Sequence, residues 1–289
     1  MHARVVAATV VAILGTAVLL SPGSDARAGD AGEPTVIAHR GASAYAPENT
    51  LASIDKAAKL GFSWVENDVQ RTKDGKLVVI HDDSLQRTTN VEQVFPGRAP
   101  WKVKDFTAAE IARLDAGSWY SPAYAGTRVP TLQQYMRRVE HNHEKLLLEI
   151  KNPELYPGIE QQTLKLLGNE GWLDHKHLGR LIVQSFSADS IRTVHKMKPA
   201  ITTAYLGSPT AAQLHQYARF TDLVNPSYGS LSKAYVAAVH TFDGPHGKPL
   251  RVFAWTVNDA ATACKVAGYD VDGIITNKPD VVRTALGSD

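Results

Sequence analysis

The chain has 289 residues, of which 44% are hydrophobic, so it is long enough to bury one sizeable core. Charged residues make up 21% of the sequence and the formal net charge is +2, so there is no strong field of either sign. These values argue against a dedicated nucleic-acid-binding protein, in which we expect a basic stripe interleaved with aromatic residues.

The N-terminus has the pattern of a secretory signal peptide. The short basic segment Met1–Arg4 precedes the unbroken apolar run Val5–Leu20, and a polar stretch then ends in an Ala-Arg-Ala tripeptide. This pattern predicts cleavage after Ala28 and export of the chain. An uncleaved membrane anchor is the competing interpretation, but the apolar run is shorter than the roughly 20 residues of a typical span. We therefore expect a secreted protein with no stable membrane insertion after cleavage.

Cys264 is the sole cysteine, so no disulfide can form within the chain. It lies in the apolar, helix-like run Ala260–Val266, where we interpret it as a buried structural thiol and not as a nucleophile. The fold must therefore be held together by its core, with a bound metal as the one further candidate.

From residue 33 onward, short β-branched runs alternate with helical patterns. Most of these runs are continuously apolar, as expected for parallel strands buried on both faces. The predicted strands are Thr35–His39, Trp64–Val69 continuing into Leu77–His81, Leu146–Ile150, Arg180–Gln184, Ile201–Leu206, Asp222–Asn225, Arg251–Val257 and Gly273–Thr276. The predicted helices are Thr50–Leu60, Thr131–Glu140, Gly158–Gly168, Ala188–Lys196, Thr210–Ala218, Ser232–His240 and Asp259–Val266.

About eight strand–helix repeats predict an α/β fold of the TIM type, a (β/α)₈ barrel. The alternative is an open doubly wound sheet, but no glycine-rich turn after the first strand supports dinucleotide binding. The long segment Asp83–Pro130, rich in Gly, Pro and Trp, interrupts the alternation after the second strand. We interpret residues 83–130 as an insertion over one rim of the barrel, so that residues 29–289 form one domain.

Polar residues at the carboxyl ends of barrel strands are candidates for an active site. Glu66 and Asp68 lie two residues apart on the second strand and therefore share a face, and Glu149 ends the third strand. Three clustered carboxylates would repel one another without a cation, and oxygen ligands favour Ca²⁺ or Mg²⁺ over zinc. The alternative is that one or two of these acids pair with Arg40 or Lys151.

Two histidines, His39 and His81, directly follow buried strands, whereas we interpret the others as structural or solvated. Cleavage of a phosphodiester needs one proton removed from the attacking oxygen and one delivered to the leaving alkoxide. Histidine can do both near neutral pH, which makes these two residues a candidate acid–base pair.

Cations and aromatic residues complete the candidate pocket. Arg40 can form a fork with phosphate oxygens, and Lys151 can act there as a point charge. Trp255, Phe186 and Tyr205 could line an apolar side of the pocket, although ordinary packing of barrel side chains is an equally good interpretation.

The motifs of this sequence, taken in order, resemble those of the glycerophosphodiester phosphodiesterase family. The resemblance covers roughly residues 35 to 285, and the ordered set is specific although each motif is weak alone. The matching motifs are His39-Arg40-Gly41, Pro47-Glu48-Asn49-Thr50, Glu66-Asn67-Asp68-Val69, His81-Asp82, Arg87-Thr88-Thr89, Leu114-Asp115-Ala116-Gly117, Val129-Pro130-Thr131-Leu132, Leu148-Glu149-Ile150-Lys151, Gln184-Ser185-Phe186, Trp255-Thr256-Val257-Asn258 and Asp272-Gly273-Ile274-Ile275-Thr276-Asn277-Lys278-Pro279.

This resemblance implies a TIM-barrel hydrolase that releases sn-glycerol 3-phosphate and an alcohol from glycerophosphodiesters. It also implies a set of site residues and one divalent cation, Ca²⁺ or Mg²⁺, but it does not say which histidine is the acid. The implied roles are metal ligands for Glu66, Asp68 and Glu149, acid–base catalysis for His39 and His81, phosphate or substrate contacts for Arg40, Lys151, Trp255 and Phe186, and support for Glu48, Asn49 and Gln184.

Three hypotheses about the substrate and activity stay open. The first is a small glycerophosphodiester substrate, with no obligate protein partner evident. The second is the same chemistry on polyglycerolphosphate wall polymers, lysolipids or sphingomyelin. The third is a catalytically silent binding barrel, which would require a lost metal ligand or histidine, whereas every expected position is filled.

Overall fold

The structure is a computed structural model that describes residues 1–2 and 32–287. Nearly all of the predicted signal peptide, residues 3–28, lies outside the described residues. Residues 32–287 belong to one compact unit. Among the described residues, no helix is both long enough and apolar enough to cross a membrane.

Eight parallel strands form a closed barrel, which confirms the predicted TIM fold and excludes the open sheet. Neighbouring strands follow the order β1-β9-β8-β7-β6-β5-β4-β2, and the pairing of Ala38 with Val65 joins β1 to β2 and closes the ring. The barrel strands are β1 (Thr35–Ala38), β2 (Trp64–Arg71), β4 (Lys145–Ile150), β5 (Leu181–Ser185), β6 (Thr202–Leu206), β7 (Leu223–Asn225), β8 (Arg251–Ala254) and β9 (Gly273–Thr276).

The ninth strand, β3 (Leu77–Val79), runs antiparallel to β2, with Val79 opposite Val69. The prediction that this segment continues the second strand is therefore wrong. The chain reverses in a turn in which Thr72 and Lys76 are hydrogen-bonded and Gly75 adopts a positive φ of 75°. Strand β1 ends at Ala38, so the C-terminal part of β2 has a free edge, and β3 pairs with that edge. The reversal leads the chain after β3 back toward the barrel mouth.

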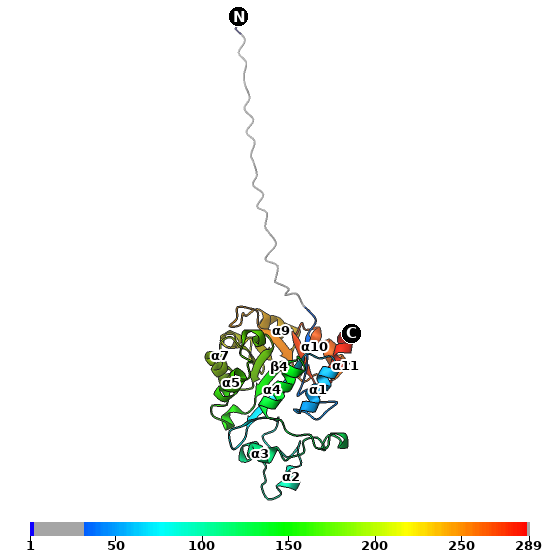
Figure 1. Ribbon diagram of the computed structural model, residues 1–289. Helices are drawn as coiled ribbons and strands as arrows, with labels where there is room; N and C mark the ends of the chain where they lie inside the picture. The colour runs from blue at the N-terminus through cyan, green and yellow to red at the C-terminus, as the bar shows by residue number, and fades with distance from the viewer. Residues whose placement is uncertain (3–31, 288–289) are drawn as a thin grey trace. The chain divides into compact units, whose positions relative to one another are not determined.

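Helices follow the barrel strands and cover the outside of the sheet (Figure 1). These are α1 (Leu51–Lys59), α4 (Leu132–His141), α5 (Ile159–Asn169), α6 (His175–Leu178), α7 (Ala188–Met197), α8 (Leu214–Tyr217), α9 (Lys233–His240), α10 (Ala260–Ala267) and α11 (Pro279–Leu286), with the 3₁₀ helices η3 (Pro153–Leu155) and η4 (Tyr228–Ser230). Thr50 and Thr131 begin α1 and α4 with capping boxes. The helix predicted over residues 210–218 is shorter than expected, because hydrogen-bonded turns occupy residues 210–213.

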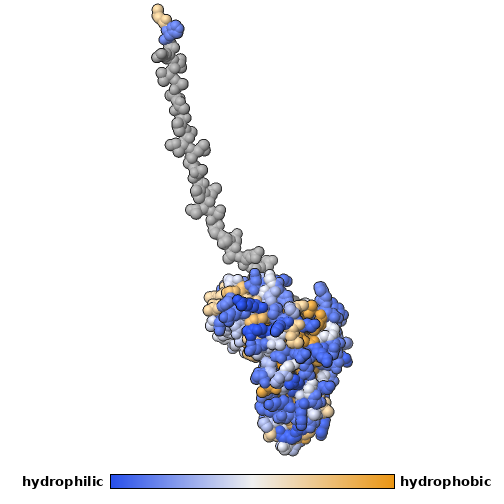
Figure 2. All heavy atoms as spheres, turned by 90° about the vertical axis from the view of Figure 1, so that its left-hand side faces the viewer, coloured by the Kyte–Doolittle hydropathy of each residue, from blue (hydrophilic) through white to orange (hydrophobic). Residues whose placement is uncertain are grey.

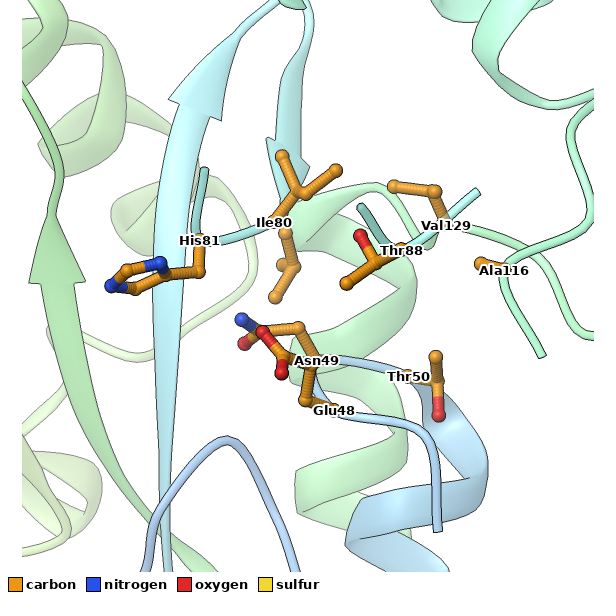
Figure 3. Close-up of a pocket in the computed structure, with 9 residues that line it drawn as sticks. Glu48, Asn49, Thr50, Ile80, His81, Thr88, Ala116 and Val129 are labelled. Atoms are coloured by element: carbon orange, nitrogen blue, oxygen red, sulfur yellow. The ribbon is translucent and has the colours of Figure 1, made fainter. Parts of the chain in front are cut away.

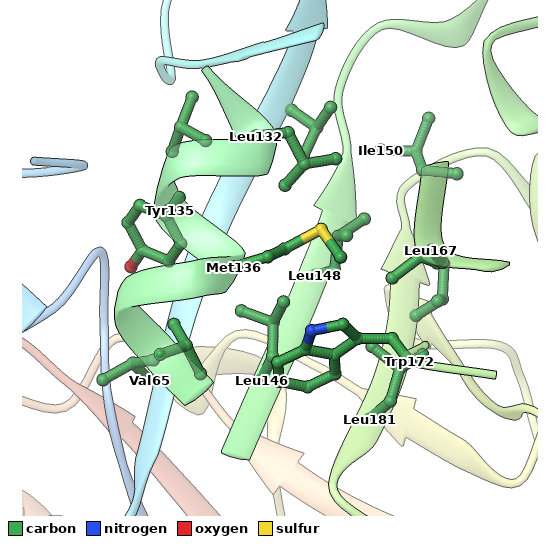
Figure 4. Packing of buried hydrophobic residues seen from close by; sticks show 14 of the residues in the cluster. Val65, Leu132, Tyr135, Met136, Leu146, Leu148, Ile150, Leu167, Trp172 and Leu181 are labelled. Carbon is green, nitrogen blue, oxygen red and sulfur yellow. The ribbon is translucent and has the colours of Figure 1, made fainter. Parts of the chain in front are cut away.

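The largest apolar cluster lies between the helices and the outer face of β2, β4 and β5. Figure 4 shows Leu132 and Met136 of α4 packed toward Leu146 and Leu148 of β4, and Trp172 belongs to the same cluster. Each fully buried side chain of this size contributes roughly 1.5–3 kcal/mol to folding. This packing fixes β2 and β4, the two strands that carry the candidate metal ligands.

The Cys264 prediction is wrong, because its side chain is exposed. Helix α10 packs on the barrel through Ala263 and Val266, and the residue after Ala263 is rotated by about 100° toward solvent. Figure 2 shows that the face in view is mainly hydrophilic, with apolar residues in small patches.

The segment between β3 and α4 carries α2 (Val91–Val94), η1 (Val103–Asp105), α3 (Ala108–Ile111) and η2 (Pro122–Tyr124). It has an apolar cluster of its own, which includes Phe106 and Leu114, and Figure 1 shows α2 and α3 on one side of the barrel helices. The Tyr120 hydroxyl donates to the Ala44 carbonyl at 2.6 Å, and the Tyr124 hydroxyl donates to the Tyr45 carbonyl at 2.8 Å. The insertion is thereby attached to the loop between β1 and α1.

Candidate active site

The interior of the barrel changes from apolar to polar along the strands. Ile37, Leu147 and Ile182 belong to the apolar layer inside the barrel. Side chains two residues further along a strand point to the same side, so the next inward-facing layer contains polar groups. This layer includes His39, Glu66, Glu149, Gln184, Asn225 and Trp255, and all of these but Asn225 line one cavity of about 60 Å³ at the barrel mouth.

Glu66, Asp68 and Glu149 converge at this cavity, which Glu66 and Glu149 line. One carboxylate oxygen from each lies within 4.8 Å of the others, and all three side chains are buried. Asp68 Oδ1 accepts no hydrogen bond from any described residue. Buried oxygen donors with such an unused acceptor suit a hard divalent cation, so the donor set fits the predicted metal.

The three carboxylates strongly affect one another's ionisation. Burial, followed by the charges of Asp68 and Glu149, raises the pKa of Glu66 well above its ordinary value. Burial and the charge of Asp68 also raise the pKa of Glu149 to about 8. Burial alone would raise the pKa of Asp68, but the charges of Arg40, His81 and Lys151 hold it below its ordinary value. A bound cation would relieve this mutual repulsion.

Asn49 orients Asp68 from the loop before α1. Its Nδ2 donates to Asp68 Oδ2 at 2.8 Å, and its Oδ1 accepts from the Asp68 backbone N–H at 3.2 Å. Asn49 has a positive φ of 58°, which asparagine tolerates better than most residues. The supporting role predicted for Asn49 therefore has a defined contact.

His39 follows β1 and is held by a neutral partner. Its Nδ1 lies 2.6 Å from Asn277 Oδ1, and its Nε2 lies 4.0 Å from Glu66 Oε2. Burial, followed by the charge of Arg40, lowers the pKa of His39 to about 4. The ring is therefore neutral at physiological pH, with Nε2 directed at the acidic cluster.

His81 follows β3 and is held by a charged partner. Its Nδ1 lies 2.7 Å from Asp82 Oδ1, and its Nε2 lies 3.2 Å from Lys151 Nζ. A carboxylate that accepts from one ring nitrogen fixes the tautomer and the orientation of the imidazole. The structure thus brings the two predicted histidines to one cavity, although His81 comes from the antiparallel hairpin and not from a barrel strand.

Arg40 and Lys151 are both tied to the acids. Arg40 Nη1 donates to Glu48 Oε1 at 2.9 Å, its Nε lies 3.4 Å from Asp68 Oδ2, and its backbone N–H donates to Glu66 Oε2 at 2.9 Å. Lys151 Nζ lies 2.9 Å from Glu149 Oε1. The alternative that these cations pair with the acids therefore holds in this structure, and they remain placed to meet an anion in the cavity.

The turn that carries Arg40 requires glycine at the next position. Gly41 has a φ of 77°, and an added Cβ would lie 2.4 Å from Ser53 Oγ and 2.6 Å from the Ser53 backbone carbon. Only glycine fits so close to α1 at a positive φ. This close approach explains why the strand-end motif reads His-Arg-Gly.

Two residues that the sequence prediction left without a role complete the network. Arg87 donates to Asp82 and to Glu48, so it links the partner of His81 to the partner of Arg40. Asn277 holds His39. Both residues lie in motifs that match the family pattern. Their presence there as polar residues without an assigned role was the only sign in the sequence that they belong to the site. Figure 3 shows Glu48 and Asn49 facing the chain that carries Ile80 and His81.

The apolar wall of the cavity agrees with the prediction in part. Phe186 and Trp255 line the cavity and pack edge to face, with 5.5 Å between their ring centroids, and Phe186 is half exposed. Tyr205 does not line it, because the neighbouring Ala204 faces the barrel interior and Tyr205 packs outside against Tyr217. Leu206 takes the place expected for Tyr205. Gln184 lines the cavity and accepts a hydrogen bond from Asn225 Nδ2 at 2.9 Å.

The sequence profile of the glycerophosphoryl diester phosphodiesterase family matches residues 39–281. The chain belongs to this family. A glycerophosphodiester phosphodiesterase of Bacillus subtilis is 35% identical over 301 aligned positions, which cover 96% of each chain. Another, from Caldanaerobacter subterraneus, is 36% identical over 258 positions that cover 86% of this chain and 95% of the relative.

A solved structure of this fold supports the same assignment. An Oleispira antarctica phosphodiesterase in complex with the product sn-glycerol-3-phosphate superposes with a TM-score of 0.76 at 29% identity. The match covers 89% of this chain and 98% of that structure. The family relatives confirm the predicted enzyme class, a phosphoric diester hydrolase of the glycerophosphodiester phosphodiesterase family.

Proposed function

We propose that this protein hydrolyses glycerophosphodiesters to sn-glycerol 3-phosphate and an alcohol with the help of one divalent cation. The observation that carries the proposal is the convergence of three buried carboxylates and two histidines on one cavity within this family's fold. Small glycerophosphodiesters are the substrate class that we favour, because a cavity of about 60 Å³ suits a small polar group.

We assign the base to His39 and the acid to His81. The Nδ1–H of His39 donates to the neutral Asn277 amide, so the Nε2 lone pair is available to take a proton from the attacking hydroxyl. The Asp82 carboxylate holds the Nδ1 side of His81 at 2.7 Å and orients the ring, so that its Nε2 can deliver a proton to the leaving alkoxide. Each such proton transfer typically contributes roughly 10²–10⁴-fold to the rate.

Glu66, Asp68 and Glu149 would hold Ca²⁺ or Mg²⁺. The ion would supply positive charge beside the phosphoryl oxygens as negative charge builds on them. Lys151 is placed to add a point charge at the same oxygens, and Arg40 to add a guanidinium. Phe186 and Trp255 would contact the apolar surface of the glycerol moiety and exclude water from that side.

Hydrolysis of glycerophosphocholine, followed by the release of sn-glycerol 3-phosphate, tests this function. We expect metal-supplemented wild-type protein to be active, and we expect chelator, His39→Ala or His81→Ala to lower turnover by at least about 100-fold. His141→Ala is the matched control, because His141 is exposed at the end of α4. Wild-type turnover in either site variant would refute the histidine assignment.

The same assay distinguishes small glycerophosphodiesters from a second candidate substrate, polyglycerolphosphate wall polymer. Comparison of glycerol 3-phosphate release from small diesters, wall polymer and lysolipid ranks the three substrate classes. A preference for polymer or lysolipid would leave the chemistry in place and change the substrate class.

We also propose that residues 1–28 form a signal peptide and that the mature enzyme acts outside the cytoplasm. The basic, apolar and Ala-Arg-Ala segments of the sequence support this. N-terminal sequencing of protein collected from the culture medium should give Gly29 as the first residue. Cell-associated protein that retains Met1 would contradict it.

A further inference from the structure

The insertion contributes a single guanidinium, that of Arg87, to the rim of the active site. Arg87 Nε donates to Asp82 Oδ2 at 2.6 Å, and its Nη2 donates to Asp82 Oδ1 at 3.0 Å. The same Nη2 donates to Glu48 Oε1 at 2.8 Å, and Nη1 donates to Glu48 Oε2 at 2.9 Å. All three nitrogens of the group are therefore used, and each carboxylate is held by two hydrogen bonds.

Both carboxylates hold a second site residue with the same oxygen atoms. Asp82 Oδ1 also contacts His81 Nδ1, and Glu48 Oε1 also accepts from Arg40 Nη1. Arg87 is thus the middle of an unbroken chain that runs from His81 through Asp82, Arg87 and Glu48 to Arg40. Asp82 follows β3 and Glu48 precedes α1, and Arg87 donates to both, so it joins these two segments at the level of the site.

We propose that Arg87 is a positioning residue that holds the proton donor His81 and the phosphate-binding Arg40 in one rigid arrangement. This inference rests on the proposed function, and it adds a residue of the insertion to the machinery of the barrel. Arg87 does not line the cavity, so it acts through Asp82 and Glu48.

Electrostatics supports a joint role over two independent ion pairs. Hydrogen bonds from Arg87 hold the pKa of Asp82 well below its ordinary value. Burial alone would raise the pKa of Glu48, but Arg87 and Arg40 hold it below its ordinary value. Without the guanidinium, two negative carboxylates would face each other at the rim and turn away from their histidine and arginine partners. Lysine could not replace it, because a point charge cannot donate two hydrogen bonds to each of two carboxylates.

Steady-state kinetics on glycerophosphocholine with saturating metal tests the proposal. We expect Arg87→Ala to lower kcat roughly 10–100-fold, as for other residues that orient a catalytic group, and to raise KM as well. Asp82→Asn should lower kcat with little change in KM, and Glu48→Gln should mainly raise KM. In the double variant R87A/D82N, kcat should equal that of D82N alone, because both changes break the same link.

Controls separate positioning from loss of fold. Arg98→Ala removes another arginine of the insertion, one that pairs with Glu110 and stacks on Phe106, and it should keep wild-type kcat and KM below its unfolding temperature. Guanidinium ion at millimolar concentration should restore part of the activity of R87A but not that of D82N. Arg87→Lys should keep the fold, and its kcat should stay below half of the wild-type value. This variant serves as the test if R87A unfolds.

The outcomes distinguish this proposal from the proposed function. Two outcomes with an active wild type would overturn the positioning role alone. In the first, the kcat of both R87A and R87K lies within twofold of the wild-type kcat. In the second, the fold-losses in kcat of R87A and D82N multiply in the double variant. A wild type that cleaves no glycerophosphodiester would instead overturn the function on which the proposal rests.

Discussion

Asn49 holds one oxygen of Asp68 and leaves the other without a hydrogen bond from any described residue. The donated hydrogen bond, at 2.8 Å, goes to Oδ2, whereas Oδ1 lies 3.8 Å from Lys151 Nζ and accepts no hydrogen bond. An asparagine on the loop before α1 therefore determines which carboxylate oxygen of Asp68 is hydrogen-bonded and which stays available as a ligand. The first prediction follows from this contact.

We expect Asn49→Ala to weaken binding of the activating cation roughly 10–100-fold, because the oxygen donor is no longer held in place. Activity at saturating metal should fall much less. The measurement is the metal concentration at half-maximal activity, with Asn142→Ala as the control asparagine at the end of α4. Equal metal dependence in wild type and N49A would show that Asp68 is positioned by β2 alone.

The acidic cluster should also make stability depend on metal. Its carboxylates repel one another when they are ionised, and a ligand that binds only the folded state stabilises it by about 2.7 kcal/mol at 100 times its Kd. We expect CaCl₂ or MgCl₂ to raise the Tm of wild-type protein at pH 8. Asp68→Asn should show little metal-induced rise in Tm, because it removes one of the three carboxylate ligands. An equal rise in both proteins would place the ion elsewhere.

Glu144, outside the active site, should give the fold a pH dependence. Its side chain is 1% exposed, its Oε1 has no hydrogen-bond partner, and burial raises its pKa to about 8. Between the unfolded pKa, near 4.5, and about 8, the folded state keeps a proton that the unfolded state has lost. Stability from this residue is therefore full at low pH and falls as the pH rises through that window.

Glu144→Gln should remove this loss. We expect the free energy of unfolding of E144Q to exceed that of wild type by a few kcal/mol at pH 8.5, and the difference to shrink toward pH 5. Chemical denaturation at a series of pH values measures it, with the exposed Glu154→Gln as the control. A difference that does not change with pH would mean that Glu144 ionises normally in the folded protein.

Phe186 should act on substrate affinity and not on chemistry. It is half exposed and packs edge to face on Trp255 at the mouth of the cavity. We expect Phe186→Ala to raise KM about 5–30-fold, the loss of roughly 1–2 kcal/mol of apolar contact, with kcat within about threefold of wild type. Trp119→Ala is the matched control, because Trp119 is an exposed aromatic residue that lines none of the cavity. A change in kcat without a change in KM would show that Phe186 affects the chemical step and not substrate affinity.

The fold and the central site residues follow from the sequence because strand periodicity and strand-end chemistry are local signals. Glu66, Asp68 and Glu149 lie at positions whose spacing already sets their face. Tyr205 could not be placed in this way, because a strand that is apolar on both faces does not reveal which residues point into the barrel. The reversed direction of β3 was hidden for a similar reason, since an apolar run has the same appearance in either orientation.

The partners of the histidines lie beyond the reach of local pattern. Asn277 is 238 residues away from His39 in the chain, and Arg87 reaches Glu48 across 39 residues. Closure of the barrel makes the first contact, and docking of the insertion makes the second. Only a specific family pattern pointed to these residues, and it could not say what they touch.

The hairpin origin of His81 places the two histidines of the proposed acid–base pair on separately attached strands. His39 is borne by a strand embedded in the ring, whereas His81 is borne by β3, which is attached to the outer part of β2. The length of the β2–β3 hairpin around the turn at residues 72–76 therefore sets the position of His81 along β2. Adding or removing two residues in β3 would shift His81 by roughly 6.6 Å along β2 on the same face and leave the ring intact, whereas a one-residue change would turn its side chain to the other face. Enzymes with the same barrel can thus differ in the distance between these two histidines through the length of this hairpin alone.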